Sequence, residues 1–174
     1  MDMRTRITAA SERVFDETGF AASGMDLLTS AAGVSTRTLY KHFGSKQGLV
    51  AAVLARRHAR FESDLVAESV DGLFAALAVW VDTEGPRGCL FLRARGEGGI
   101  ADTAVLAAVD GHKQALRALV DRLVAAEAGE NALLAEQIAV LYEGATAAAV
   151  YRGRRAVEAA REAAATLMAQ ARSA

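Results

Sequence analysis

The chain has 174 residues, a formal net charge of −1, a single Pro and a single Cys, and 52% of its residues are apolar. This length supports one hydrophobic core, or one core with a small module attached to it. Few Pro residues and abundant Ala, Leu, Glu and Arg favour helix. No uninterrupted apolar run approaches the ~20 residues of a membrane span, and the lone Cys89 excludes an internal disulfide. The composition therefore predicts an all-α cytoplasmic protein without a membrane segment.

Charge is distributed unevenly along the chain. Residues 1–60 hold nine Lys or Arg and five Asp or Glu, whereas the remainder holds eleven and sixteen. No acidic residue lies between Asp26 and Glu62. A basic N-terminal part on an acidic body indicates an anionic partner for the N-terminal part alone.

Apolar residues at helical spacing predict four helices in the N-terminal part, over residues 4–18, 25–32, 36–43 and from 46 to about 65. Ser23 and Ser35 are the expected N-caps of the second and third helices. Gly33 is expected in the left-handed turn between them, where a residue without Cβ is favoured. Two short helices joined through such a turn and braced by a preceding helix predict a helix-turn-helix.

The same periodicity predicts further helices over residues 73–81, 103–126, 132–151 and 154–171. Residues 88–99, GCLFLRARGEGG, alternate partly as a strand would, but a single strand has no pairing partner. We therefore predict a short helix followed by a glycine-rich turn there. The fold class is then all-α with about nine helices: a three-helix module that carries the helix-turn-helix over residues 1–46 and a helical bundle over residues 47–174.

The third predicted helix has two chemically different sides. Leu39 and Phe43, four residues apart, attach one side to the core. The other side carries hydroxyl, phenol and cationic groups, which donate hydrogen bonds to phosphates, and Arg37 can contact a guanine in bidentate fashion. A carboxylate in this stretch would repel a duplex. The pattern predicts a recognition helix for the DNA major groove.

The segments GVSTRTLYKHFGSK (33–46) and GLVAAVL (48–54) resemble the DNA-binding module of TetR-type transcriptional repressors, and ITAASERVFDETGF (7–20) resembles its first helix and connector. The resemblance departs at Thr29, where Ala is usual, and at Leu27, where an acidic residue is common. It implies phosphate contacts from Tyr40, His42 and Lys46, and base reading by Thr36 and Arg37. The full set of implied DNA-binding residues is Ser35, Thr36, Arg37, Thr38, Tyr40, Lys41, His42 and Lys46.

For the body, the resemblance implies a regulatory domain that binds a small apolar or amphipathic effector and forms a homodimer. Ala- and Gly-rich helices allow close approach, so we expect the interface in the last two helices, about residues 132–171, with ordinary packing within one chain as the alternative. The effector candidates are Phe74, Trp80, Phe91, His112 and Tyr142. Each has a role as an ordinary core residue as its alternative, and this alternative is favoured for Phe74, Trp80 and His112.

Together these features predict a repressor that binds a palindromic operator as a homodimer and is released by an effector. Two alternatives remain open: a DNA-binding protein controlled by a partner protein, and a binding protein with a vestigial module. RNA binding or membrane binding by the basic cluster is disfavoured. RNA-binding proteins typically use an aromatic platform and membrane-binding segments a continuous amphipathic helix, and the sequence shows neither in this cluster. We expect no enzyme, metal or cofactor, because the three histidines are scattered and no metal-ligand spacing or nucleophile motif occurs.

Overall fold

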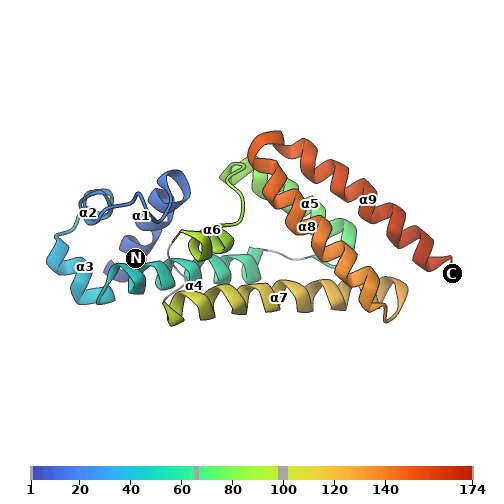
Figure 1. Ribbon diagram of the computed structural model, residues 1–174, viewed down its shortest axis with the longest axis horizontal. Helices are drawn as coiled ribbons and strands as arrows, with labels where there is room; N and C mark the ends of the chain where they lie inside the picture. The colour runs from blue at the N-terminus through green and yellow to red at the C-terminus, as the bar shows by residue number, and fades with distance from the viewer. Residues whose placement is uncertain (1, 65–66, 98–101, 174) are drawn as a thin grey trace. The chain divides into compact units, whose positions relative to one another are not determined.

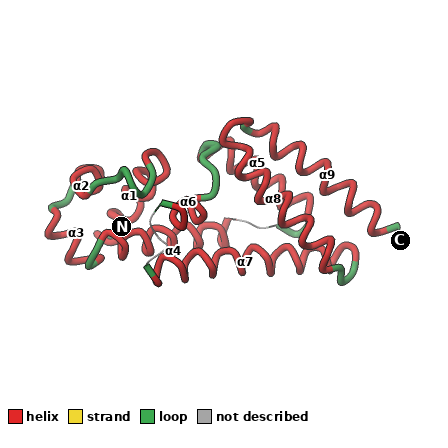
Figure 2. Tube along the Cα trace, viewed as in Figure 1, coloured by secondary structure: helices red, strands yellow, loops and turns green. Residues whose placement is uncertain are grey.

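The computed structural model describes residues 2–64, 67–97 and 102–173. These residues form α-helices and no strand (Figures 1 and 2), which confirms the predicted all-α class. Residues 90–96, the segment with partly strand-like alternation, are helical as expected. The helices are α1 (Met3–Thr18), α2 (Met25–Ala32), α3 (Thr36–Phe43), α4 (Lys46–Asp64), α5 (Val70–Glu84), α6 (Leu90–Gly96), α7 (Thr103–Ala128), α8 (Ala132–Arg152) and α9 (Arg154–Arg172).

Contacts divide the chain into two compact units. The first combines Met1–Phe61 with Leu90–His112, and the second combines Glu62–Cys89 with Lys113–Ala174. The first unit thus adds α6 and the start of α7 to the helices of the DNA-binding module. The linear boundary expected after residue 46 stays a prediction.

The core of the first unit is built from the apolar stripes of its helices. Ile7 and Phe15 of α1, Leu28 of α2 and Leu39 of α3 are fully buried. The ring of Phe20 stacks on Phe15 with centroids 4.6 Å apart. Burial of each such side chain contributes about 1.5–3 kcal/mol, so together they stabilise the core of this unit.

The expected cap of α2 is wrong. Gly24, not Ser23, is the N-cap residue, and no side chain caps this helix. Ser23 is fully buried, and its hydroxyl instead donates to the carbonyl oxygen of Gly19 and lies 2.7 Å from the Thr18 hydroxyl. A Ser at this position therefore stabilises the connector between α1 and α2 rather than the start of α2.

In the second unit, α9 packs on α8 and α5. Phe74 of α5 meets Tyr142 of α8 edge to face at 5.9 Å, and both are buried. The 21-residue α8 is long and apolar enough to cross a bilayer by length and composition, although polar residues interrupt its apolar runs. Only 33% of its most apolar 18-residue window is buried within the described residues, so much of α8 lacks a cover from this chain.

Candidate nucleic-acid interface

A tight turn joins α2 to α3. Gly33 has φ 63° and ψ 41°, the left-handed conformation that favours glycine. The N–H of Val34 donates to the Thr29 carbonyl at 3.0 Å. Ser35 then caps α3 by accepting from the N–H of Thr38 at 3.1 Å, as expected. These contacts build the predicted helix-turn-helix.

Thr29, the departure from the usual Ala, is accommodated locally. Its hydroxyl donates to the carbonyl oxygen of Met25 at 3.0 Å and also approaches that of Asp26 at 3.1 Å. The polar group is thus satisfied within α2 itself, and Thr29 can lie buried at the approach of α2 and α3 without an unpaired donor.

The two sides of α3 are as different as the sequence indicates. Leu39 is fully buried and Phe43 is 9% exposed. Ser35, Thr36, Arg37, Tyr40 and Lys41 are exposed, whereas Thr38 and His42 are half-buried. The hydroxyls of Ser35 and Thr38 also bond to each other at 2.9 Å as part of the cap. The exposed side therefore presents hydroxyl, phenol and cationic donors with no carboxylate among them.

Two cationic side chains outside this exposed side donate hydrogen bonds to backbone carbonyls of the module. Lys46, expected to contact phosphate, donates from Nζ to the carbonyl oxygen of Phe20 at 2.6 Å and is half-buried. Arg4, which the sequence reasoning did not single out, donates to the carbonyl oxygen of His42 at 2.5 Å and lies over the Phe43 ring at 4.6 Å. A cation at a helix C-terminus is electrostatically favourable, so Arg4 stabilises the end of α3.

Three arginines of α4 lie against carboxylates of α1. Arg56, Arg57 and Arg60 all pair with Glu12 of α1, and Arg57 also pairs with Asp16. Glu12 is 4% exposed and Arg57 is 7% exposed. The carboxylates missing from residues 27–61 are thus supplied by α1, and these three arginines join α1 to α4.

The effector candidates fall into different groups. In the first unit, Phe91 of α6 stacks on His112 of α7 with ring centroids 3.7 Å apart and an interplanar angle of 4°. In the second unit, Phe74 contacts Tyr142, while Trp80 of α5 is half-buried. Burial, with smaller contributions from Cys89 and Glu143, raises the pKa of Tyr142, so its phenol is neutral at physiological pH. An effector pocket at these residues stays a prediction.

An open groove of about 570 Å³ runs along α8 and α9, and none of the five effector candidates lines it. Its apolar side chains are Val140, Leu141, Ala163 and Leu167, and its polar ones are Glu136, Gln137, Thr166 and Gln170. Val140 is 62% exposed in the isolated chain. The groove lies in the segment for which the sequence predicts a homodimer interface.

The described residues hold no group of three or more His, Cys, Asp or Glu side chains placed to bind a metal ion. His58 and His112 do approach each other, with their Nδ1 atoms 3.3 Å apart. Two imidazoles at this distance are compatible with one hydrogen bond between them. Both imidazole rings also contact the ring of Phe61.

Residues 7–53 match the family described as bacterial regulatory proteins, tetR family. The HTH-type transcriptional activator FasR of Mycolicibacterium smegmatis is 44% identical over 55 residues, which are 32% of this chain and 25% of that protein. The HTH-type transcriptional regulator UidR of Escherichia coli is 37% identical over 57 residues, 33% of this chain and 29% of that protein. The match therefore spans between a quarter and a third of the length of these curated relatives.

Solved structures resemble the chain over nearly its whole length. A TetR-family transcriptional regulator from Streptomyces coelicolor aligns with a TM-score of 0.84 and 25% identity, covering 98% of this chain and 96% of that one. A TetR-type regulator from Streptomyces avermitilis aligns with a TM-score of 0.82 and 25% identity, covering 98% of both chains. The helix-turn-helix module and the helical body together thus have the fold of known TetR-family structures.

The turn geometry and the polar exposed side of α3 define a helix-turn-helix of the kind found in DNA-binding proteins, and the curated relatives that match it are named as transcriptional regulators rather than enzymes. Residues 7–53 carry a helix-turn-helix of the tetR family, and the fold of the described residues is similar to that of TetR-family regulators. The expectation drawn from residues 33–46 is confirmed at the level of the family.

Proposed function

We propose that this protein represses transcription by binding a palindromic operator as a homodimer, and that a small apolar or amphipathic effector releases it. The observation that carries the proposal is the exposed side of α3, where Thr36, Arg37, Tyr40 and Lys41 lie without a carboxylate beside them. Such a side meets the negative potential of a duplex without like-charge repulsion. DNA as the partner also implies the cytoplasm as the site of action.

The proposed DNA contacts lie on α3, at its N-cap or at the start of α4. Thr36 and Arg37 lie in the first turn, the part of a recognition helix that enters the major groove first. Arg37 can donate two parallel hydrogen bonds to a guanine. Ser35, Thr38, Tyr40, Lys41 and His42 supply donors suited to phosphates. Lys46 has three N–H groups and uses one for Phe20, so a phosphate contact by this residue remains part of the proposal.

The homodimer is supported by the surface of α8 and α9. Besides the groove, α8 exposes Leu133, Val150 and Tyr151, which are 70%, 55% and 77% exposed. A row of large apolar side chains without a cover marks an interaction surface. A second copy of the same surface provides an apolar cover by two-fold symmetry. Two recognition helices then read two half-sites about 34 Å apart.

The sign of regulation is tested separately from DNA binding, because the relative FasR is named an activator. DNA duplexes are first selected from a random pool, and a reporter gene is then placed behind the enriched sequence. The reporter output distinguishes repression from activation. Repression predicts lower reporter output when the protein is present. Palindromic enrichment with a steep loss of binding as salt rises supports the dimeric reader. Absence of any enrichment would contradict the proposed function.

The effector is expected to act by preferring one of two arrangements of the dimer, so that it weakens operator binding. Linkage then requires the operator to weaken effector binding by the same factor. A screen of apolar and amphipathic compounds by thermal stabilisation, with and without operator, measures both directions. Equal stabilisation in both conditions would contradict effector-driven release and favour control by a partner protein.

Base reading and phosphate contact are separable by two substitutions on the exposed side of α3. Arg37→Ala is expected to cost about 1–3 kcal/mol of binding free energy on the selected operator and to relax the preference at one base position. Lys41→Ala is expected to weaken all duplexes alike and to reduce the slope of log K against log salt by about one. Fluorescence anisotropy across a salt series with operator and scrambled duplexes gives both quantities. The assignment is wrong if the two variants lose the same affinity on both duplexes.

A further inference from the structure

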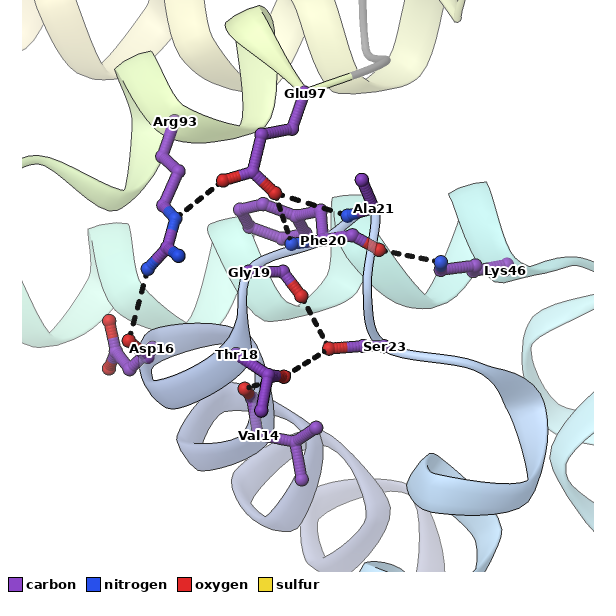
Figure 3. A network of polar contacts seen from close by, with 10 residues as sticks. All are labelled: Val14, Asp16, Thr18, Gly19, Phe20, Ala21, Ser23, Lys46, Arg93 and Glu97. Atoms are coloured by element: carbon purple, nitrogen blue, oxygen red, sulfur yellow. Dashed lines mark hydrogen bonds and ion pairs between the residues drawn. The ribbon is translucent and has the colours of Figure 1, made fainter.

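The connector between α1 and α2, residues 19–24, is held by hydrogen bonds from outside the helix-turn-helix itself (Figure 3). The carboxylate of Glu97, directly after α6, accepts from the N–H of Phe20 at 2.6 Å and from the N–H of Ala21 at 3.1 Å. These residues are separated by 77 and 76 positions in the chain. A carboxylate that accepts backbone N–H groups forms charge-assisted bonds, which are about twice as strong as neutral ones.

A second side chain of α6 holds the preceding helix. Arg93 pairs through Nε with Glu97 at 2.6 Å and donates from Nη1 to the carbonyl oxygen of Asp16 at 3.1 Å. Asp16 lies in the last turn of α1, where backbone carbonyls lack partners within the helix. The Arg93 guanidinium therefore satisfies one of these carbonyls and orients the Glu97 carboxylate at the same time (Figure 3).

Phe20 connects this pair to the end of the recognition helix. Its N–H binds Glu97, and its carbonyl oxygen accepts from Lys46, which follows α3 by three residues. Phe20 is 4% exposed, and its ring stacks on that of Phe15. Both polar groups of one buried residue are thus used to join α6, the connector and the segment after α3.

Gly19 shows how closely α6 approaches the connector. Its φ is +86°, and a Cβ added there would lie 2.6 Å from Oε2 of Glu97 and 2.9 Å from Nη2 of Arg93. Any other residue would both strain the backbone and displace these two side chains. The connector therefore has room for the contact with Glu97 only because glycine precedes Phe20.

From this geometry we infer that Glu97 is a positioning residue for DNA binding, which ties α6 to the α1–α2 connector and thereby holds the helix-turn-helix in the arrangement that binds a duplex. This inference rests on the proposed function. Glu97 does not touch DNA in this account, and it acts through Phe20 and Lys46 on the segment that ends α3.

The ionisation state of Glu97 suits this role. Burial of the carboxyl raises its pKa, but hydrogen bonds from Ala21, Arg93 and Phe20 lower it further than burial raises it, so the pKa lies below the ordinary 4.5. The carboxylate is therefore charged at neutral pH. Its contribution to stability is fully present above about pH 4.5 and is lost as pH falls through the lowered pKa.

The test compares Glu97→Ala, Glu97→Gln and the control Asp110→Asn in the full-length chain. Glu97→Gln keeps an oxygen that can accept from Phe20 and Ala21 but loses the charge. Asp110→Asn removes an exposed ion pair between Arg95 of α6 and α7, at 3.0 Å, without touching the connector. Hydrogen exchange of the Phe20 and Ala21 amides and affinity for the operator duplex obtained by selection are measured for each protein.

Glu97→Ala is expected to speed exchange at both amides and to weaken operator binding about tenfold, the loss of roughly one charge-assisted hydrogen bond. Glu97→Gln should show a smaller increase in exchange rate and a smaller loss of operator affinity. Asp110→Asn should change neither the exchange rate nor the affinity. Wild-type operator affinity in Glu97→Ala, or a loss as large in Asp110→Asn, would overturn the inference. If the wild type binds no duplex, the proposed function fails, whereas unchanged exchange in Glu97→Ala contradicts the contact itself.

Discussion

Replacing Val140 by Glu is expected to convert the dimer into monomers and to weaken operator binding by about 100- to 10,000-fold, because the second half-site no longer benefits from a linked partner. Val140 lines the apolar groove on α8 and α9 and is 62% exposed in the isolated chain. A carboxylate there costs little in a monomer but must be desolvated in a dimer, opposite its own symmetry mate. Sedimentation equilibrium gives the oligomeric state, and fluorescence anisotropy gives the affinity.

The matched control is Val79→Glu on α5. Val79 is 58% exposed, close to the exposure of Val140, and lies outside the groove on α8 and α9. This variant should stay dimeric and bind operator as the wild type does. If Val140→Glu remains a dimer, the interface lies elsewhere and the groove has another occupant. If it becomes monomeric yet keeps its operator affinity, the two-helix reading of a palindrome is wrong.

The second large effect is expected from Glu12→Ala, which should lower the free energy of unfolding by about 3–5 kcal/mol. Glu12 is 4% exposed and pairs with Arg56, Arg57 and Arg60. Removing it leaves the Arg57 charge, itself 7% exposed, with less compensation in a poorly solvated position. Urea unfolding followed by circular dichroism measures the loss, and Glu158→Ala, which removes an exposed pair with Arg154, should change little.

A second readout separates this structural role from DNA contact. Because Arg56 is engaged with Glu12, Arg56→Ala should leave the salt slope of operator binding unchanged, whereas Lys41→Ala reduces it. A wild-type unfolding curve for Glu12→Ala, together with a reduced slope for Arg56→Ala, would contradict this structural role.

Local patterns in the chain predicted most of the elements. A period of 3.6 residues predicted the helices other than α6, the left-handed preference of Gly33 predicted the turn, and the hydroxyl of Ser35 predicted the cap of α3. The division of α3 into a buried side with Leu39 and an exposed side with Arg37 follows from the same period. These features depend on residues within a few positions of one another, so the sequence suffices for them.

The sequence by itself therefore determined the helices, the turn and the exposed cationic side of α3. Only the tertiary structure decided which charged side chains are engaged within the protein, because their partners are distant in the chain. Glu12 pairs with Arg56, 44 positions away, and Glu97 accepts from the N–H of Phe20, 77 positions away. The tertiary structure likewise decided that Ser23 serves the connector and that Lys46 holds Phe20. A charge is identifiable from the sequence, but whether it faces solvent or a buried opposite charge depends on how the helices pack.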